Sequence, residues 1–507
     1  MARQRKTAAL VKRLLLSLAV LSFGCFLAAR YIGGRSQATS APTAAAQPQK
    51  PPPQPAFPNA NPAFIPPPAI YSGPLFVLSQ DYPAQRPTER PGFLSDNFKA
   101  DWKSYMMKVR DYCFEGNTDV DFRVEHNTVR RWYHMPWQDY GPQGREGIHG
   151  LTKEAQVQKQ QLASTQVYVN GQTVAVGFFN DLAGYTIGQV WADHSNPDPS
   201  KSSKPNGFPI GAVVFKLLFV DVPPNQVPSL ANPKQWQAYI DPCYKQPCTP
   251  PATGRVLKQV SLIQMDIAIR TDDPQAPTGW LFGTFQYNGA LNRPNAWENL
   301  VPVGLQWGND HAVNGNTYTQ RSFTQGPDKT KINPKLKESV INDDPNELPP
   351  THLGWDGRLN GPVDNPISSC MSCHMTAQFP SVAPLNPSFQ SKYAYTFDPK
   401  GNAYWMRWFQ DIDCATPFGN YITGGVPERG VKTLSTDFGL QLAISITNFC
   451  DENPQAAVCT PAEGEPVEAS DKAAKILGAS PRTRTLRAKP HTVEPIVRDV
   501  PESRPRP

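Results

Sequence analysis

Runs of β-branched and aromatic residues in the middle of this 507-residue chain constrain its fold most strongly. Such runs are typical of β-strands. Turn sequences such as Asn170-Gly171 and Asn180-Asp181 separate them, which favours hairpins between antiparallel neighbours. The expected strands are Gln166–Val169, Thr173–Phe179, Tyr185–Trp191, Ala212–Asp221, Arg255–Arg270 and Trp280–Tyr287. Few helical patterns lie between them, so we expect a mainly β (α+β) fold whose body is an antiparallel β-sandwich or barrel.

Three segments have the spacing of helices. The first begins at a cap at Ser95 or Asp96 and ends near Tyr112, because its aromatic and apolar residues recur on one helical face. Asn402–Ile412 is the second expected helix. Thr436–Phe449 is the third, although its apolar residues also alternate and therefore permit a strand.

Cys370-Met371-Ser372-Cys373-His374 is the segment with the most specific chemistry. On a helical turn, positions i, i+3 and i+4 project from one face. Two cysteines at this spacing, with a histidine directly after them, form the attachment sequence of a c-type haem. We expect one covalent haem c, held by Cys370 and Cys373, with His374 as the proximal iron ligand. A redox disulfide or half of a zinc site is the alternative, but the next cysteine, Cys414, stands alone.

The sixth iron ligand determines what such a haem does. A methionine or histidine there gives a low-spin electron carrier, whereas an open position gives a reactive or ligand-binding iron. We expect Met406 as the distal ligand, with a core methionine as the alternative interpretation. His352 and His311 are alternative imidazole ligands, although lone histidines are more often satisfied polar residues.

Charge is unevenly distributed along the chain. The formal net charge is +6, but residues 1–35 and 471–507 are both basic, and residues 36–470 carry a net charge of −6. An acidic body lacks the clustered cations that nucleic-acid binding requires. We therefore expect no nucleic-acid partner.

The N-terminal residues have the pattern of an export element. Five cations precede the uncharged run Leu14–Ala29, which is long for a signal peptide and short for a full membrane span. Cations on this side hold the N-terminus in the cytoplasm and direct the rest of the chain across the membrane. We expect a protein on the periplasmic side of the bacterial inner membrane, anchored there or released after signal cleavage. Its expected partners are that membrane and a periplasmic redox protein.

Composition divides the chain into six parts. They are a signal or anchor at 1–35, a Pro-rich linker at 36–70, a β-rich body at 75–310, a connecting region at 311–365, a partly helical haem c-binding region at 366–460 and a disordered tail at 461–507.

Six cysteines remain after Cys25 and the haem pair, and export permits them to form disulfides. Cys243 and Cys248 bracket a short turn and are the first expected pair. Cys450 with Cys459 is the second. Buried free thiols are the alternative for each pair.

Two clusters of polar residues among aromatic ones lie early in the β-rich body, at Arg130–Trp137 and Gly144–Gly150. An Arg and a His near a bound peroxide or nitrogen oxide could stabilise charge and transfer protons. No spacing in these clusters is diagnostic of such a pocket. We therefore favour a surface loop with an aromatic lid and one Arg–Glu pair.

Cys370–His374 resembles the attachment sequence of c-type cytochromes as a class. The order of Phe208–Lys216, Thr278–Phe285 and a later Cys-x-x-Cys-His is also similar to that of the β-sheet c-type cytochromes, a family that includes cytochrome c′-beta and its hydroxylamine- and nitric-oxide-oxidising relatives. The resemblance implies a mostly antiparallel sheet and a five-coordinate haem with an open distal face. Some members link a lysine to the porphyrin, and Lys216 is the lysine in the matching strand.

These features together predict an exported mono-haem c-type cytochrome that transfers single electrons. An open-iron haem enzyme that oxidises a small nitrogen compound or uses peroxide is the second hypothesis. A haem-based ligand sensor is the third.

Overall fold

The structure is a computed structural model that describes fourteen stretches of the chain. They are residues 54–139, 144–157, 161–162, 171–203, 205–244, 248, 254–313, 332–348, 353–365, 368–381, 406–413, 416, 418 and 433–460. The chain divides into two units, residues 1–53 and 54–507, and all described residues belong to the second. Several expectations therefore lie outside the described residues: the run Leu14–Ala29, the strand Gln166–Val169, His352, Cys414 and the tail 461–507. No helix in the described stretches is long and apolar enough to span a bilayer.

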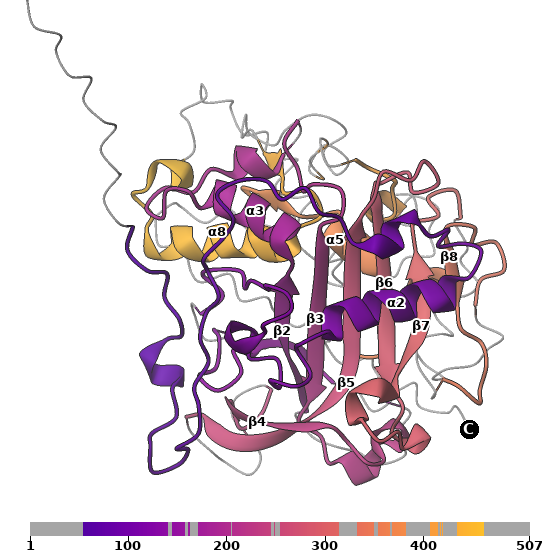
Figure 1. Cartoon of the computed structure of the whole chain (residues 1–507), viewed down its shortest axis with the longest axis horizontal. Coiled ribbons are helices and arrows are strands. Elements are labelled where there is room, and N and C mark those ends of the chain that lie inside the picture. The colour runs from indigo at the N-terminus through magenta and orange to yellow at the C-terminus, as the bar shows by residue number, and fades with distance from the viewer. Residues whose placement is uncertain are drawn as a thin grey trace, which may run out of the picture. The chain divides into compact units, whose positions relative to one another are not determined.

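An antiparallel sheet of eight strands forms the body of the second unit (Figure 1). Its strands are β1 (Thr152–Gln156), β2 (Gln172–Phe179), β3 (Val213–Val220), β4 (Gln235–Ile240), β5 (Val256–Arg270), β6 (Trp280–Tyr287), β7 (Leu300–Gln306) and β8 (Ser339–Ile341). Their order is β1-β2-β3-β5-β6-β7-β8, and β4 pairs with the first half of β5. The expectation of a mainly antiparallel β fold is confirmed. The finer expectation of a sandwich or barrel is wrong for the described residues. The large sheet is open, and the second sheet found there consists of the two short strands β9 (Gln378–Phe379) and β10 (Leu434–Ser435).

Four expected strands are confirmed as β2, β3, β5 and β6, but the expected strand Tyr185–Trp191 is wrong. It lies largely in helix α3 (Asp181–Val190). The Asn180 side chain caps this helix by accepting a hydrogen bond from the Ala183 amide. Burial of Leu182, Ala183 and Ile187 then follows the helical rather than the alternating period.

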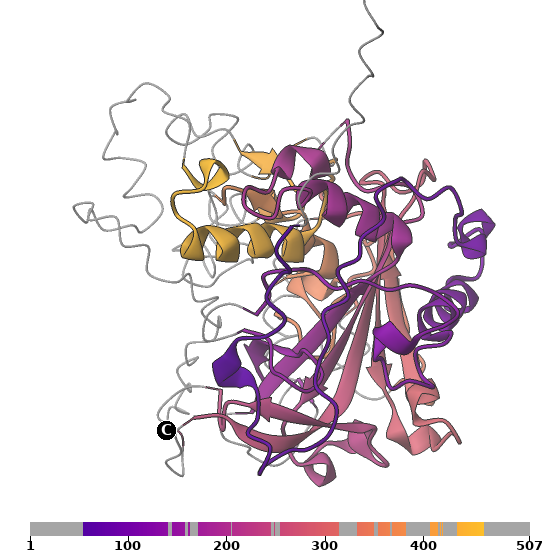
Figure 2. The same cartoon turned by 60° about the vertical axis from the view of Figure 1, so that its left-hand side comes forward.

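The two faces of the sheet differ in chemistry because side chains alternate along each strand. On β5, Met265 and Ile267 enter a large apolar cluster beneath helix α2 (Trp102–Phe114). The neighbouring residues Gln264, Asp266 and Ala268 point to the opposite face. Figure 2 shows α2 on one side of the sheet and the C-terminal elements on the other. The second face therefore carries the polar groups and meets the region with the cysteine motif.

Helix α2 confirms the expected aromatic stripe but starts later than predicted. Its N-cap is Asp101, whose carboxylate accepts a hydrogen bond from the Ser104 amide, and not Ser95 or Asp96. Gly92–Ser95 instead forms a separate 3-10 turn. The buried residues Tyr105, Val109 and Cys113 attach the helix to the sheet, and Cys113 is a free thiol.

The C-terminal region packs against α3 at one end of the sheet. Helix α8 (Leu440–Glu452) resolves the helix-or-strand ambiguity of residues 436–449, and it lies beside α3 in both views (Figures 1 and 2). The expected helix Asn402–Ile412 is wrong in its described part, where only the 3-10 turn Met406–Trp408 is present. Helix α5 (Cys370–His374) contains the cysteine motif.

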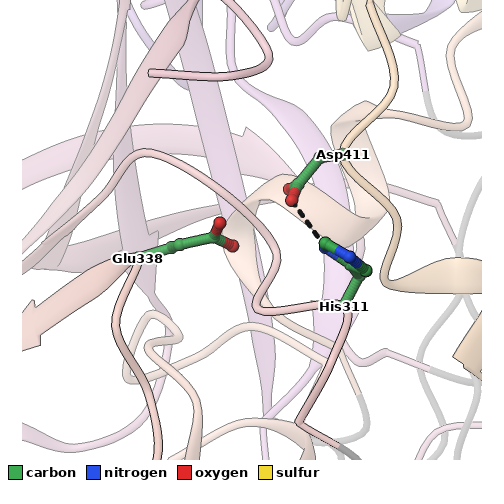
Figure 3. A group of neighbouring side chains, drawn as sticks. All are labelled: His311, Glu338 and Asp411. Atoms are coloured by element: carbon green, nitrogen blue, oxygen red, sulfur yellow. Dashed lines mark hydrogen bonds and ion pairs between the residues drawn. The ribbon is translucent and has the colours of Figure 1, made fainter. Parts of the chain in front are cut away.

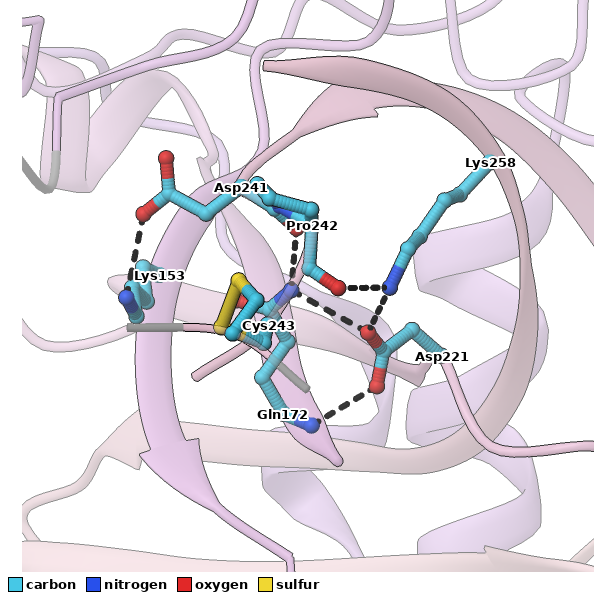
Figure 4. The surroundings of a disulfide bond; sticks show 8 residues. Lys153, Gln172, Asp221, Asp241, Pro242, Cys243 and Lys258 are labelled. Atoms are coloured by element: carbon cyan, nitrogen blue, oxygen red, sulfur yellow. Dashed lines mark hydrogen bonds and ion pairs between the residues drawn. A yellow bond between two sulfur atoms is a disulfide. The ribbon is translucent and has the colours of Figure 1, made fainter. Parts of the chain in front are cut away.

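Both expected disulfides, Cys243–Cys248 and Cys450–Cys459, are present. Beside the first, the buried Asp221 carboxylate accepts hydrogen bonds from the Gln172 amide at 2.7 Å and from Lys258 Nζ at 2.7 Å (Figure 4). Lys258 also donates to the Pro242 carbonyl. The crosslinked turn is thereby held against β2 and β5.

Candidate haem-attachment site

Helix α5 is short and is fixed at its start by two serines. Ser369 is the N-cap: its hydroxyl accepts a hydrogen bond from the Ser372 amide, and the Ser372 hydroxyl accepts one from the Ser369 amide at 2.8 Å. This reciprocal capping box satisfies two backbone donors at the helix start. The Met371 amide also donates to Gln306 Oε1 at 3.1 Å, which attaches the helix to β7.

The three motif side chains share the accessible face of α5. Cys370, Cys373 and His374 are half-buried, whereas Met371, Ser372 and Met375 are buried. Cys370 and Cys373 do not form a disulfide with each other or with any described cysteine. Burial raises the pKa of the Cys373 thiol to about 12 and also raises that of the Cys370 thiol well above its ordinary value. Two free thiols and an imidazole on one face are the donor set that haem c requires, so the residues fit this cofactor.

The imidazole of His374 is held in one tautomer. Its Nδ1 lies 3.0 Å from the carbonyl oxygen of Phe438. A carbonyl only accepts, so Nδ1 carries the proton and the Nε2 lone pair is left for a metal. Burial lowers the pKa of His374 to about 4, which keeps the ring neutral. The Phe282 ring, with its centroid 4.7 Å from that of the imidazole, supports one side of it.

The Phe438 carbonyl is positioned by a buried turn. Asp437 and Phe438 both have left-handed φ angles, of 48° and 63°, which cost roughly 1 kcal/mol each in non-glycine residues. The Asp437 carboxylate offsets this cost: it accepts hydrogen bonds from the Phe208 amide at 2.7 Å and from Trp280 Nε1 at 2.9 Å, and it lies 3.7 Å from Arg270. The sequence analysis missed this support, for which the turn sequence Asp437-Phe438-Gly439 was the available signal.

A row of polar residues crosses the sheet on the side of α5. Lys216 on β3, Asp266 on β5 and Thr284 on β6 are direct neighbours in register. Gln264 Nε2 connects two carboxylates, because it donates to Asp266 at 2.7 Å and to Asp364 at 3.0 Å. We refer to Lys216, Asp266, Thr284, Gln264 and Asp364 as the polar row.

The charges of the polar row act on the cysteine motif. Burial alone lowers the pKa of Lys216, but Glu154, at 3.6 Å, together with Asp266 and Asp364 raises it above its ordinary value. Burial and the charge of Asp364 raise the pKa of Asp266 to about 7. The Lys216 charge in turn lowers the pKa values of Cys373 and His374. Apart from Lys216, the sequence analysis missed this row, although polar residues at alternate positions of β5 were its signal.

Met406 is buried near α5, in the same apolar cluster as Met371 and Met375. Its position is therefore compatible with either the ligand or the core interpretation. The sulfur of Met375 accepts a hydrogen bond from Asn309 Nδ2 at 3.2 Å. His311 is exposed, and its Nδ1 lies 2.8 Å from Asp411 Oδ2, so its closest partner is a carboxylate.

The clusters at Arg130–Trp137 and Gly144–Gly150 make structural contacts. Arg145 is buried and donates to the Met135 carbonyl at 2.7 Å, and the Glu146 carboxylate accepts backbone hydrogen bonds from Ile148 and Tyr239. The predicted surface loop is wrong in exposure, since most of its described residues are buried. The Arg–Glu pair is Arg130 with Glu115, not Arg145 with Glu146.

Comparison of the chain with family models, with curated proteins and with solved structures finds no match in any of the three.

Proposed function

We propose that this chain is an exported c-type cytochrome that carries one haem and transfers single electrons. The observation that carries the proposal is the accessible face of α5, where two free cysteines lie beside an imidazole whose Nδ1 is bonded to the Phe438 carbonyl. Bound haem c would supply a one-electron iron couple. The basic N-terminal residues followed by Leu14–Ala29 support a location on the periplasmic side of the inner membrane, with a redox protein there as partner.

The residues of the chain have separate tasks in this proposal. Cys370 and Cys373 form the thioether bonds and fix the position of the cofactor. His374 presents Nε2 as the proximal ligand, and the Phe438 carbonyl raises the basicity of that nitrogen through the hydrogen bond to Nδ1. The apolar cluster around Met371, Met406 and Phe282 lowers the local dielectric and limits access of water. Met406 is the proposed distal ligand.

The ferric absorption spectrum of the haem-loaded protein tests this proposal. A low-spin spectrum with a sulfur-to-iron band, which becomes high-spin in Met406→Ala, is the expected result. Met107→Ala, which changes a partly buried methionine of α2, is the matched control and should keep the low-spin form. A spectrum that is unchanged in Met406→Ala would exclude Met406 as the ligand.

The polar row favours a second candidate, an open-iron enzyme that acts on a small nitrogen compound or on peroxide. A carboxyl group whose pKa is raised to about 7 can both take and give a proton at neutral pH, and Asp266 is such a group. The resemblance to the β-sheet c-type cytochromes points in the same direction. This candidate predicts a high-spin ferric spectrum in the unaltered protein and turnover that falls in Asp266→Asn without loss of bound haem.

A further inference from the structure

A second cluster of potential ligands lies outside the cysteine motif. His311 follows β7, Glu338 directly precedes β8, and Asp411 follows the turn Met406–Trp408 (Figure 3). One nitrogen or oxygen atom from each side chain lies within 4.8 Å of the others. Three segments that are distant in sequence therefore bring an imidazole and two carboxylates to one point.

The hydrogen bonds around these groups pre-orient the two carboxylates. Asp411 Oδ1 accepts from the Asn309 amide at 2.8 Å, which leaves Oδ2 directed at His311 Nδ1. Glu338 accepts from the Asp310 amide. Both carboxylates are only partly exposed, whereas the His311 ring is open to solvent. The cluster is thus fixed on its inner side and accessible on its outer side.

Among the described residues, the side chain that pairs with these carboxylates is His311, through Asp411. No Lys or Arg among the described residues lies within 4.0 Å of the Glu338 or Asp411 carboxylates. Arg358, the nearby buried cation, donates to the carbonyls of Asn309 and Asp310 and lies 3.6 Å from the Asp356 carboxylate, so its charge reaches Glu338 and Asp411 only from a longer distance. Burial and the charge of Asp411 raise the pKa values of both Glu338 and Asp310, as expected for carboxylates that repel one another.

We propose that His311, Glu338 and Asp411 bind a first-row divalent cation. One imidazole and two carboxylates suit Zn²⁺ or Mn²⁺ and leave coordination positions for water. The positive charge of the cation would offset the negative charge of the Glu338 and Asp411 carboxylates. Neither thiol of α5 takes part, so the site does not depend on haem attachment.

The bound cation would join the edge of the sheet to the segment that contains Met406. Asn309 extends this connection to α5, because its Nδ2 donates to the Gln410 carbonyl and to the Met375 sulfur, and its Oδ1 accepts from the Ser369 hydroxyl at 3.2 Å. Cation binding would therefore stabilise the surroundings of the cysteine motif.

Titration of the tag-free, chelator-treated full chain with Mn²⁺, followed by the electron paramagnetic resonance signal of free Mn²⁺, tests the proposal. Mn²⁺ is the probe because it disfavours thiolate ligands and therefore does not report Cys370 or Cys373. Saturable binding of one Mn²⁺ per chain is expected, weaker by at least about tenfold in His311→Ala and in Asp411→Asn.

His126→Ala is the matched control, since His126 is also an exposed histidine, and the carboxylate of Glu125 is the one that lies within ion-pair distance of it in the described part of the chain. It should bind Mn²⁺ like the unaltered chain. Glu338→Gln is a third variant of the site, and its side-chain amide oxygen can still accept the hydrogen bond from the Asp310 amide. Circular dichroism of each variant verifies that the fold is retained. Absence of saturable binding, or binding unaffected by all three substitutions, would overturn the site.

Discussion

At the residue scale, the properties of His374 come from distant residues. Phe438, whose carbonyl fixes the tautomer, is 64 residues away in the sequence. Its conformation depends in turn on Asp437, whose side chain is fully buried and bonded to the sheet. The motif itself could be found from the sequence because its five residues are contiguous. The groups that tune it could not, because only the fold brings them together.

Removal of the Asp437 carboxylate should destabilise the protein strongly. Asp437→Ala leaves the Phe208 amide, the Trp280 indole N–H and the Arg270 charge without this acceptor, so we expect a loss of about 3 kcal/mol in the free energy of unfolding. Urea unfolding measures it. Asp272→Ala removes an exposed carboxylate that pairs with Arg90 at 3.6 Å, and this control should change stability by less than about 0.5 kcal/mol. Equal losses in the two variants would contradict the proposed role of Asp437.

Stability should decrease below about pH 6.5 because His134 is buried in its neutral form. Its Nδ1 accepts from the Ser79 amide at 3.0 Å, and burial, followed by the charge of Arg145, lowers its pKa well below the ordinary value. The unfolded chain therefore binds a proton at His134 that the folded chain does not, so the stabilisation is complete above pH 6.5 and is lost as the pH falls.

His134→Asn, in which an amide oxygen can replace the Nδ1 acceptor, isolates this effect. The free energy of unfolding of the unaltered protein should fall between pH 7 and pH 5 by up to about 1.4 kcal/mol per pH unit more than that of the variant. Urea unfolding at several pH values measures both slopes. Identical slopes would show that His134 is not the group that titrates.

At the element scale, the sequence predicted the strands whose apolar content is high. It missed four strands of the large sheet: β1 (Thr152–Gln156), which is polar, β4, the three-residue β8, and β7, which contains Pro302 and Gly304. These strands form because neighbouring strands of the sheet pair with them. The strand propensity of a single segment contains no information about such pairing. The error over residues 185–191 has the same origin: their Tyr, Thr, Ile and Val residues favour strands, but burial and the Asn180 cap select helix α3.

The short helix α5 should depend on its capping box. Ser369→Ala removes the acceptor for the Ser372 amide and the donor to Asn309, so we expect a loss of about 1–2 kcal/mol in the free energy of unfolding and a smaller yield of haem-loaded protein. Ser95→Ala is the control, because the Ser95 hydroxyl is exposed and donates to the Gly92 carbonyl within its own 3-10 turn. A Ser369→Ala protein that is as stable and as fully loaded as the control would show that the box is dispensable.

At the scale of the whole molecule, the sheet separates two environments. One face packs an apolar core under α2, and the other carries the polar row and meets the cysteine motif, α8 and the Met406 segment. The sequence predicted a β body followed by a C-terminal region with the motif. It did not predict that these parts share one site, because strand register alone aligns Lys216 with Asp266 and Thr284.

Intact-mass spectrometry of protein matured in the periplasm together with a haem-attachment system tests the central claim most directly. The measured mass should exceed the mass of the polypeptide by the mass of one haem. This excess should remain after extraction with acidified acetone, which removes haem that is not covalently bound. Cys370→Ser/Cys373→Ser should have the bare polypeptide mass, whereas Cys243→Ser/Cys248→Ser, which removes a disulfide instead, should retain the added mass. An unaltered chain that emerges at its polypeptide mass would contradict the proposal that α5 binds haem covalently.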